Sequence, residues 1–393
     1  GQKHQITVSG RFYVNGESGN PVIFRSAASS PSPGDWDNLF FNYNNGDVVI
    51  DHCQISDSEI GIRAQFSYGL NVSNCLFSNI NGRAVELQFL SHDSEFIFDS
   101  NTFVKSPYGG SSNGGVRANW FLAGSSASFT NNVFTGANAS VSQGQSLENG
   151  TAVFSGNTFT GYESDTTNPT AIDLEPDSPG NNFVVQGNII KNYESGIKLR
   201  GWSATVKDNV IEDNTWVGIH VTNNPMDLSP LEITGNTIRN NGAHGVYADG
   251  PYSNAVINNN AIYGHAEYEL FSKSILDIDA RYNYWGDTAT AEMNAGGNPK
   301  NISVIRDSYD DAGILGTVNY AGWLQSEGAS AESSMMLAIA ALTDSSYVEV
   351  EHYVKSDSNV YIEVTDTDRN VSSGSADTIT ASVASDSETD AGI

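Results

Sequence analysis

Four residues that can move protons or balance a negative charge lie in short repeated runs, and three of them occupy the same place in their runs. Lys198 and Arg200 lie in Gly-Ile-Lys-Leu-Arg, His220 in Gly-Ile-His and Tyr247 in Gly-Val-Tyr. Removing the proton next to a carboxylate requires a base of this kind, and a cation that stabilises the charge that develops. If the runs stack on one another, the sequence predicts a candidate catalytic face for an acidic glycan.

The same position in the other runs carries charges of alternating sign, which supports a structural interpretation. The column reads Arg63, Glu86, Arg117, a gap for which Ser140 is expected, Asp173, Lys198, His220 and Tyr247. Opposite charges on neighbouring strands pair with one another, and we expect Asp173 to pair with Lys198 and Glu175 with Arg200. Pairing would keep Lys198 and Arg200 protonated, so that neither acts as a base. This interpretation assigns no catalytic residue. A hydrolase with Asp173 and Glu175 as its paired carboxylates is a further alternative.

Aromatic residues near predicted loops suggest another use of the same surface. Indole and phenol rings can stack on sugar rings, which would give a carbohydrate-binding face without turnover. The candidates are Trp120, Trp202, Trp216 and Tyr252.

The runs belong to a repeat of about 26 residues that occurs ten times between residues 53 and 285. Each unit contains short runs of alternating apolar and polar residues, which predict strands with one buried face. A unit of three short strands is typical of one coil of a parallel β-solenoid. In each unit, the position two residues before an apolar residue is expected to stack into a ladder: Cys53, Cys75, Asn101, Asn132, Asn157, Asn188, Asn209, Asn236, Asn260 and Asn283.

The ladder positions are predicted to be structural. An Asn at a tight bend can adopt the left-handed backbone conformation, and its amide can bond the backbone and the equivalent Asn above and below. Cys53 and Cys75 share this register in adjacent coils. Stacked cysteines lie within disulfide range, but their parallel Cβ vectors strain a bridge, so a thiol stack and a disulfide both remain open.

The repeat over residues 4–322 resembles the right-handed parallel β-helix family, the fold of pectate lyases and of many secreted bacterial repeat proteins. Two segments strengthen the resemblance: NPVIFRSAASSPSPGDWDNLFF at 20–41 and RYNYWGD at 281–287. The resemblance implies an all-β solenoid of about twelve coils over residues 1–322. It leaves the function open, because one scaffold hosts lyases, hydrolases, epimerases, adhesins and structural rods.

The C-terminal part of the chain has a different pattern. Residues 323–346 are predicted to be a linker or capping segment with a short helix, because an apolar centre is flanked by polar residues. Residues 347–393 resemble the opening strands of an immunoglobulin-like surface-protein module, which implies a small, incomplete β-sandwich. Asp366, Asp368 and Asn370 have the spacing of a Ca²⁺ loop, although the Gly and Glu of an EF-hand are missing. Calcium is the one cofactor that we consider.

The composition of the chain limits the classes of molecule that it could bind. The 393 residues include 46 Asp and Glu but 18 Lys and Arg, for a net charge of −28, which disfavours nucleic acid as a partner. No apolar run approaches the roughly 20 residues of a membrane span. The chain starts at Gly1 without an apolar signal core, so we expect a mature or excised portion of a secreted or cell-surface product.

These patterns favour an extracellular structural or adhesive protein that associates with itself or with a cell-surface glycan. A filament built through β-edge or donor-strand contacts is the form we expect, because both ends offer unpaired strands. The alternative is a polysaccharide lyase or epimerase that uses Lys198, Arg200, His220 and Tyr247. A non-catalytic carbohydrate-binding protein is the third interpretation.

Overall fold

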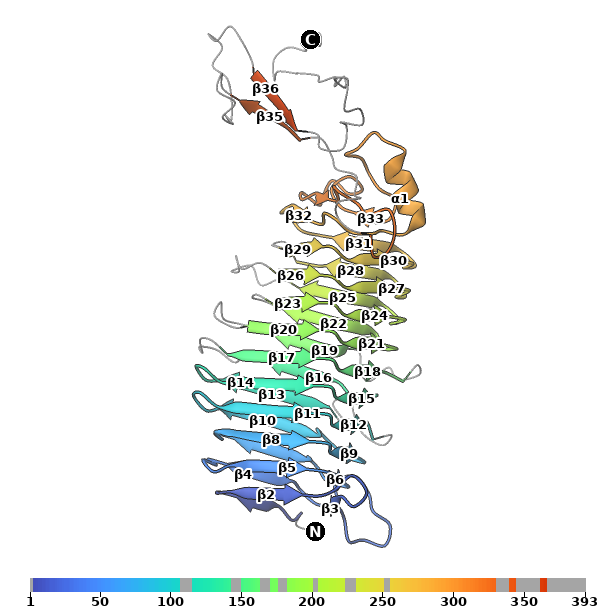
Figure 1. The fold of residues 1–393 in the computed structure, drawn as a ribbon. Coiled ribbons are helices and arrows are strands. Elements are labelled where there is room, and N and C mark those ends of the chain that lie inside the picture. Colours follow the sequence, from blue (N-terminus) through green and yellow to red (C-terminus); the bar gives the residue numbers. More distant parts are fainter. Residues whose placement is uncertain are drawn as a thin grey trace.

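The computed structural model describes residues 3–106, 115–142, 150–162, 170–175, 182–200, 204–222, 231–250, 255–329, 339–343 and 361–365. Within residues 3–329 the chain winds into a solenoid of twelve coils, each of which adds one strand to two or three parallel sheets (Figure 1). The all-β solenoid predicted from the repeat is therefore confirmed.

The first sheet carries the column of charged residues. Its twelve strands, in spatial order, are β1 (Ile6–Val8), β4 (Leu39–Asn42), β7 (Ile62–Gln65), β10 (Val85–Leu90), β13 (Val116–Phe121), β16 (Ala139–Ser142), β19 (Thr170–Glu175), β22 (Ser195–Arg200), β25 (Val217–Thr222), β28 (His244–Ala248), β31 (Tyr268–Ser272) and β33 (Ile305–Arg306).

The second sheet also has twelve strands. They are β2 (Phe12–Asn15), β5 (Val48–Asp51), β8 (Gly69–Ser73), β11 (Glu95–Asp99), β14 (Ser126–Thr130), β17 (Thr151–Ser155), β20 (Asn182–Gln186), β23 (Ala204–Lys207), β26 (Leu231–Thr234), β29 (Ala255–Asn258), β32 (Ile278–Asp279) and β34 (Val318–Asn319).

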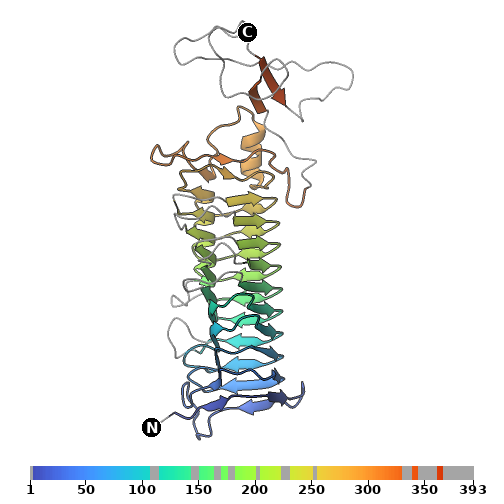
Figure 2. The same cartoon turned by 90° about the vertical axis from the view of Figure 1, so that its left-hand side faces the viewer.

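The third sheet has ten short strands that follow the ladder position. They are β3 (Val22–Phe24), β6 (Cys53–Ser56), β9 (Leu76–Ser78), β12 (Thr102–Val104), β15 (Val133–Thr135), β18 (Thr158–Thr160), β21 (Ile189–Lys191), β24 (Val210–Glu212), β27 (Thr237–Arg239) and β30 (Ala261–Tyr263). Viewed from the side, the arrows of successive coils lie directly above one another (Figure 2).

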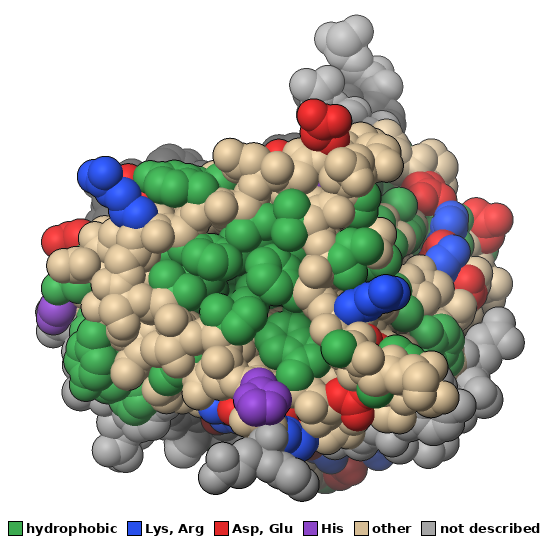
Figure 3. All heavy atoms as spheres, turned by 90° about the horizontal axis from the view of Figure 1, so that it is seen from below, with side chains coloured by type: hydrophobic (Ala, Val, Ile, Leu, Met, Phe, Trp, Pro, Cys, Tyr) green, Lys and Arg blue, Asp and Glu red, His purple; other side chains and the backbone are tan. Residues whose placement is uncertain are grey.

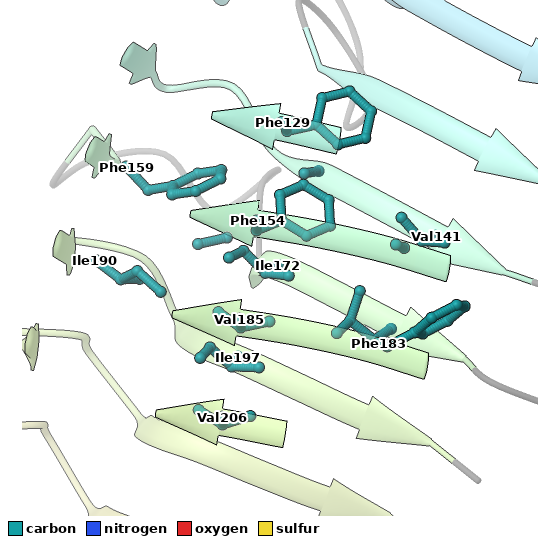
Figure 4. Packing of buried hydrophobic residues seen from close by; sticks show 14 of the residues in the cluster. Phe129, Val141, Phe154, Phe159, Ile172, Phe183, Val185, Ile190, Ile197 and Val206 are labelled. Atoms are coloured by element: carbon teal, nitrogen blue, oxygen red, sulfur yellow. The ribbon is translucent and has the colours of Figure 1, made fainter. Parts of the chain in front are cut away.

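Side chains of the same type stack inside the solenoid because each coil repeats the inward-facing positions of the last. In the third sheet Phe103, Phe134 and Phe159 form one column, with ring centroids 4.7 and 4.2 Å apart. Phe129 and Phe154 stack at 4.9 Å in the second sheet, and aliphatic residues continue that column (Figure 4). Fully burying such a side chain contributes about 1.5–3 kcal/mol. The continuous core makes the solenoid a rigid support for outward-facing residues.

The ladder asparagines bond to one another along the buried edge of the third sheet. In one rung, the backbone N–H and Nδ2 of Asn157 both donate to Oδ1 of Asn188, at 2.8 and 2.9 Å. Nδ2 of Asn157 also donates to the carbonyl of Phe129 at 2.9 Å. The left-handed conformation belongs to the residue before each ladder Asn, such as Gly156 (φ 65°) or Gly187 (φ 62°), and not to the Asn itself as we expected. The Asn amide is thereby left free to point along the axis of the solenoid.

The two cysteines continue the ladder as unbridged, buried thiols. Sγ of Cys75 donates to the carbonyl of Ser73 at 3.0 Å, and its backbone N–H donates to Oδ1 of Asn101 at 2.9 Å. A hydrogen bond with Cys75 and burial raise the pKa of the Cys53 thiol. Of the two open alternatives, the structure therefore has the thiol stack.

The two ends of the solenoid differ. Helix α1 (Asp287–Asn294) lies at the C-terminal end, where Ala289 and Met293 join the main core. At the other end β1, β2 and β3 each have a neighbour on one side only among the described strands. Hydrophobic side chains gather over the middle of this end face (Figure 3).

The described helix, α1, lies outside residues 323–346, where the sequence predicts one. It occupies residues 287–294, where Ala, Glu and Met are good helix formers and Asp287 stands in the positive first turn. Within 323–346, residues 339–343 form strand β35 (Ile339–Thr343), which pairs antiparallel with β36 (Tyr361–Thr365). Antiparallel pairing satisfies backbone groups of this apolar stretch, so the expected helix is wrong for its described part. Asp366, Asp368 and Asn370 lie outside the described residues.

Candidate functional site

The predicted column of outward-facing residues exists in the first sheet. Strand pairing places Asp173 beside Lys198, Lys198 beside His220, and His220 beside Tyr247. The column continues through Phe271 to Arg306. Three adjacent strands, β22, β25 and β28, therefore bring together the residues from which the catalytic alternative was predicted.

His220 and Tyr247 are buried although they point away from the core, as is Glu86 farther along the column. His220 is 6% exposed and Tyr247 is 8% exposed, whereas Arg63 and Lys198 in the same column are half-buried. Burial of a polar ring on the outer face removes it from water, so its hydrogen bonds and charge depend on its protein neighbours.

His220 is a neutral imidazole without a hydrogen-bond partner among the described residues. Neither ring nitrogen has such a partner, and Nε2 lies 3.7 Å from Oδ2 of Asp249, beyond hydrogen-bond range. Burial and the positive charge of Lys198 lower the pKa of His220 to about 4. At neutral pH the ring can therefore accept a proton.

Tyr247 belongs to a hydrogen-bonded group with Asp249 and Lys273. The phenol donates to Oδ1 of Asp249 at 2.9 Å, and Nζ of Lys273 donates to the phenol oxygen and, at 2.9 Å, to Oδ1 of Asp249. Burial raises the pKa of Tyr247, the hydrogen bond from Lys273 opposes this, and the bond to Asp249 adds to it. Burial opposes ionisation of Asp249, but hydrogen bonds from Lys273 and Tyr247 outweigh it and lower the pKa of that carboxyl. Tyr247 is thus a protonated phenol beside an ammonium and a carboxylate.

Arg200 forms an ion pair, but with a different residue from the one that the sequence predicts. Its Nη2 donates to Oδ2 of Asp173 at 2.5 Å, diagonally across the strands, where the sequence interpretation paired Arg200 with Glu175. Burial raises the pKa of Asp173, although Arg200 and Lys198 oppose this. Oδ1 of Asp173 and Nε of Arg200 have no partner within the described part of the chain. Each member of this ion pair therefore keeps an unused hydrogen-bonding atom.

Charge pairing does explain the column farther towards the N-terminus. Nε of Arg63 donates to Oε2 of Glu86 at 2.9 Å, as the alternating signs predict. Arg117 instead donates to the side chain of Asn119 at 3.0 Å. The structural interpretation fits the early coils, whereas the coils of His220 and Tyr247 contain buried groups that pairing leaves unsatisfied.

One of the four predicted aromatic residues lies in this cluster. The ring of Trp216 meets His220 edge to face, with centroids 5.1 Å apart, and lies 5.8 Å from Tyr247. The side chain of Trp120, and all of Trp202 and Tyr252, lie outside the described residues. Trp216 supplies an apolar wall beside the imidazole and the phenol.

The sequence analysis did not single out Lys273, although the signal for it was present. Tyr247 pairs with Phe271, and Ala248 pairs with Ser272. Two residues beyond Tyr247 and Phe271, Asp249 and Lys273 therefore lie next to each other in a second column. Extending that column by one coil would have identified it. The side chain of Lys273 is 45% exposed, so a cation stands at the solvent rim of the buried His220 and Tyr247.

The side chains of the cluster include an acid, a base and cations that can stabilise negative charge. Among the residues that the structure describes, no group of three or more His, Cys, Asp or Glu side chains could hold a metal ion. No described helix is long and apolar enough to cross a bilayer.

The family model described as "Right handed beta helix region" matches residues 112–262, which include β22, β25 and β28. The solenoid is a right-handed parallel β-helix. Among solved structures, this β-helix is similar to the crystal structure of alginate lyase from Paenibacillus sp. str. FPU-7. The identity is 15%, the match covers 65% of this chain and 89% of that chain, and the TM-score is 0.35. No curated protein matches the sequence. The β-helix match describes the scaffold, and the chemistry must be argued from the side chains.

Proposed function

We propose that the β-helix removes the proton next to the carboxylate of a uronate residue in an acidic polysaccharide, as a lyase or an epimerase. The observation that carries this proposal is His220, a buried, neutral imidazole without a described hydrogen-bond partner, beside the group of Tyr247, Asp249 and Lys273. A buried base without a partner is costly to a fold unless a ligand completes it.

His220 is the base of the proposed reaction. One of its ring nitrogens takes the proton from C5 of the sugar, and the electrons of the C–H bond move toward the adjacent carboxylate. Lys273 and Arg200 stand at the solvent side of the cluster and would stabilise the added negative charge. The incoming carboxylate also raises the proton affinity of the imidazole, because an opposite charge favours the imidazolium.

Tyr247 is the proposed acid. In a lyase the phenol gives its proton to the glycosidic oxygen, the C4–O4 bond breaks, and a C4=C5 double bond forms. Lys273 already donates to the phenol oxygen, so the phenolate that remains is stabilised by an ammonium group. A proton passes from His220 back to Tyr247 to reset the site. In an epimerase no glycosidic bond breaks, and C5 instead regains a proton from the opposite face.

The charge distribution supports an anionic substrate at this place. The chain as a whole carries −28, which repels polyanions, but Lys198, Arg200 and Lys273 gather beside the same two buried rings. A polysaccharide substrate also favours an extracellular location.

Substitutions at the two rings test the proposal. His220→Gln and Tyr247→Phe should each reduce turnover of a uronate polysaccharide by about 10²–10⁴-fold, the usual contribution of a positioned acid or base. His4→Gln, which changes an exposed histidine at the N-terminal end, is the control and should keep full activity. Full activity in either ring variant would exclude the assigned role.

A second candidate function, a self-associating structural rod, is favoured by the N-terminal end face. Ile6, Val22 and Ile23 are exposed there on strands that have a neighbour on one side only among the described strands. Unpaired strand edges with apolar side chains are templates for association. Light scattering should show association of the wild-type chain that Ile23→Asp abolishes. Monomers of both proteins at every concentration would exclude this candidate.

A further inference from the structure

A ladder of aromatic rings lies on the outside of the β-helix, far along the solenoid from His220. Tyr43, Phe66 and Phe89 lie in the second, third and fourth coils; Tyr43 and Phe66 directly follow β4 and β7, and Phe89 is the second-last residue of β10. Neighbouring rings are stacked, with centroids 4.7 Å apart in both pairs and planes inclined by 8° and 7°. The ring of Tyr43 ends the described stack and is 66% exposed.

The backbone of these three residues is unfavourable for aromatic side chains. Tyr43, Phe66 and Phe89 have φ values of 48°, 49° and 54°. Asn, Asp, Ser or His occupies every other described left-handed position that is not Gly, except for Tyr282. For a bulky residue this conformation costs on the order of 1–2 kcal/mol. Three consecutive coils therefore bear a conformational cost that Asn or Gly would avoid, and such strain gathers at functional sites.

The ladder borders a hollow of about 400 Å³ that combines ring faces with polar groups. Tyr43, Phe66 and Tyr68 line it, and Tyr68 is 60% exposed. Asn45, Ser91 and His92 contribute an amide, a hydroxyl and an imidazole. The volume lies within the range of about 300–1,000 Å³ that is typical of small-ligand sites.

The turns that form the hollow are held in place by hydrogen bonds. Nδ2 of Asn44 donates to the carbonyl of Gly10 at 2.8 Å, and the backbone N–H of Tyr68 donates to the carbonyl of Asn44 at 2.9 Å. Oγ of Ser94 donates to the carbonyl of Ser91 at 2.6 Å. A rigid site loses little conformational entropy when a ligand binds.

We propose that this hollow binds a pyranose ring of a neutral glycan. The apolar face of the sugar would lie on the aromatic rings, and its hydroxyls would bond Asn45, Ser91 and His92. Among the described residues that line the hollow there is neither Lys nor Arg, so they offer no fixed positive charge to a uronate, in contrast to the surroundings of His220. The site is separate from the proposed catalytic cluster and stands whether or not that cluster is active.

Calorimetry with neutral and with acidic oligosaccharides tests the proposal. The wild-type chain should bind a neutral oligosaccharide, and both Phe66→Asn and Tyr68→Ala should weaken binding about tenfold or more. Tyr282→Asn is the matched control, because it changes an aromatic residue in the same left-handed conformation (φ 61°) near the other end of the solenoid. The control should bind as the wild type does.

Thermal unfolding of the same variants separates a binding role from a structural one. Phe66→Asn places a residue that tolerates the left-handed conformation, so the Tm should stay the same or rise while binding falls. A lower Tm with unchanged binding would mean that the ladder only stabilises the turns, and would overturn the proposal. Absence of binding to every neutral oligosaccharide, or binding of acidic ones alone, would overturn it as well.

Discussion

His220 and Tyr247 stack on adjacent strands, with ring centroids 5.1 Å apart and ring planes inclined by 18°. Strand pairing fixes this relationship, because the two residues are direct partners in the register of β25 and β28. A base and an acid held on a rigid sheet need little reorganisation before they react. The proposed chemistry depends on this pair.

The activity should persist to unusually acidic pH for a histidine base. Burial and the charge of Lys198 lower the pKa of His220 to about 4. As the pH is lowered, kcat/KM should therefore decline only near pH 4, which is the acidic limb of the pH profile. The limb of an unperturbed histidine would lie near 6.5. Lys198→Met removes one positive charge beside the ring, so it should move the limb to higher pH. An unchanged limb in this variant would contradict the electrostatic explanation.

A buried carboxyl should make stability fall as the pH rises. Oε1 of Glu269 accepts the N–H of Gly264 at 3.0 Å, Oε2 lies 3.4 Å from Nε2 of His265, and burial raises the pKa of Glu269 to about 8. The pKa of Glu269 in the folded state lies above its ordinary value of 4.5. The protonated carboxyl therefore contributes its full stabilisation of the fold below pH 4.5. This stabilisation is lost as the pH rises through 8.

The variant Glu269→Gln isolates this effect, because Gln cannot ionise. Burial lowers the pKa of His265 to about 4, so its contribution is complete above about pH 6.5 and is lost only as the pH falls. Denaturant unfolding between pH 6.5 and 9 should therefore show a steeper loss of stability in the wild type than in the variant. Equal slopes would contradict the assigned pKa.

Removing one rung of the Asn ladder should destabilise the β-helix. In Asn188→Ala the N–H of Asn157 loses its acceptor and the carbonyl of Phe154 loses its donor. Each buried group left unpaired costs about 1–3 kcal/mol. Asn182→Ala, which removes an exposed amide on β20, is the matched control and should change the free energy of unfolding by less than about 0.5 kcal/mol. Similar values for both variants would mean that the ladder does not contribute.

The two cysteines should behave as protected thiols. Their burial and the raised pKa of Cys53 disfavour the reactive thiolate. A thiol reagent should label neither cysteine in the folded chain, and both cysteines after the chain is unfolded without reductant. If no thiol appears after unfolding, the two cysteines are bridged and the free-thiol arrangement is wrong.

The sequence predicts the scaffold well because the residue pattern that determines each coil is local. Alternation determines which side chains share a face, so Lys198, His220 and Tyr247 could be placed in one column before the structure was known. Long side chains escape such rules, because Arg200 reaches diagonally to Asp173. Burial on the outer face also depends on tertiary context, which is why the isolation of His220 could not be predicted.

Local propensity also misleads at two other places. Aromatic residues are disfavoured in the left-handed conformation, so nothing in the sequence suggested that Tyr43 and Phe66 stand at stacked turns. The apolar stretch around 339–343 resembles a helix by composition, but its described residues pair with β36. Whether such a segment forms a strand is determined by pairing with a partner that is distant in sequence, and not by its own residues.

Product analysis by NMR in D₂O tests the central claim most directly, with a panel of uronate polysaccharides as substrates. We expect the wild-type chain to form an unsaturated uronate or to incorporate deuterium at C5 of at least one substrate, because a lyase and an epimerase both begin by removing that proton. His220→Gln should do neither at a comparable rate, and His4→Gln should match the wild type. The account is contradicted if the wild type changes no member of the panel, or if His220→Gln is as active as the wild type.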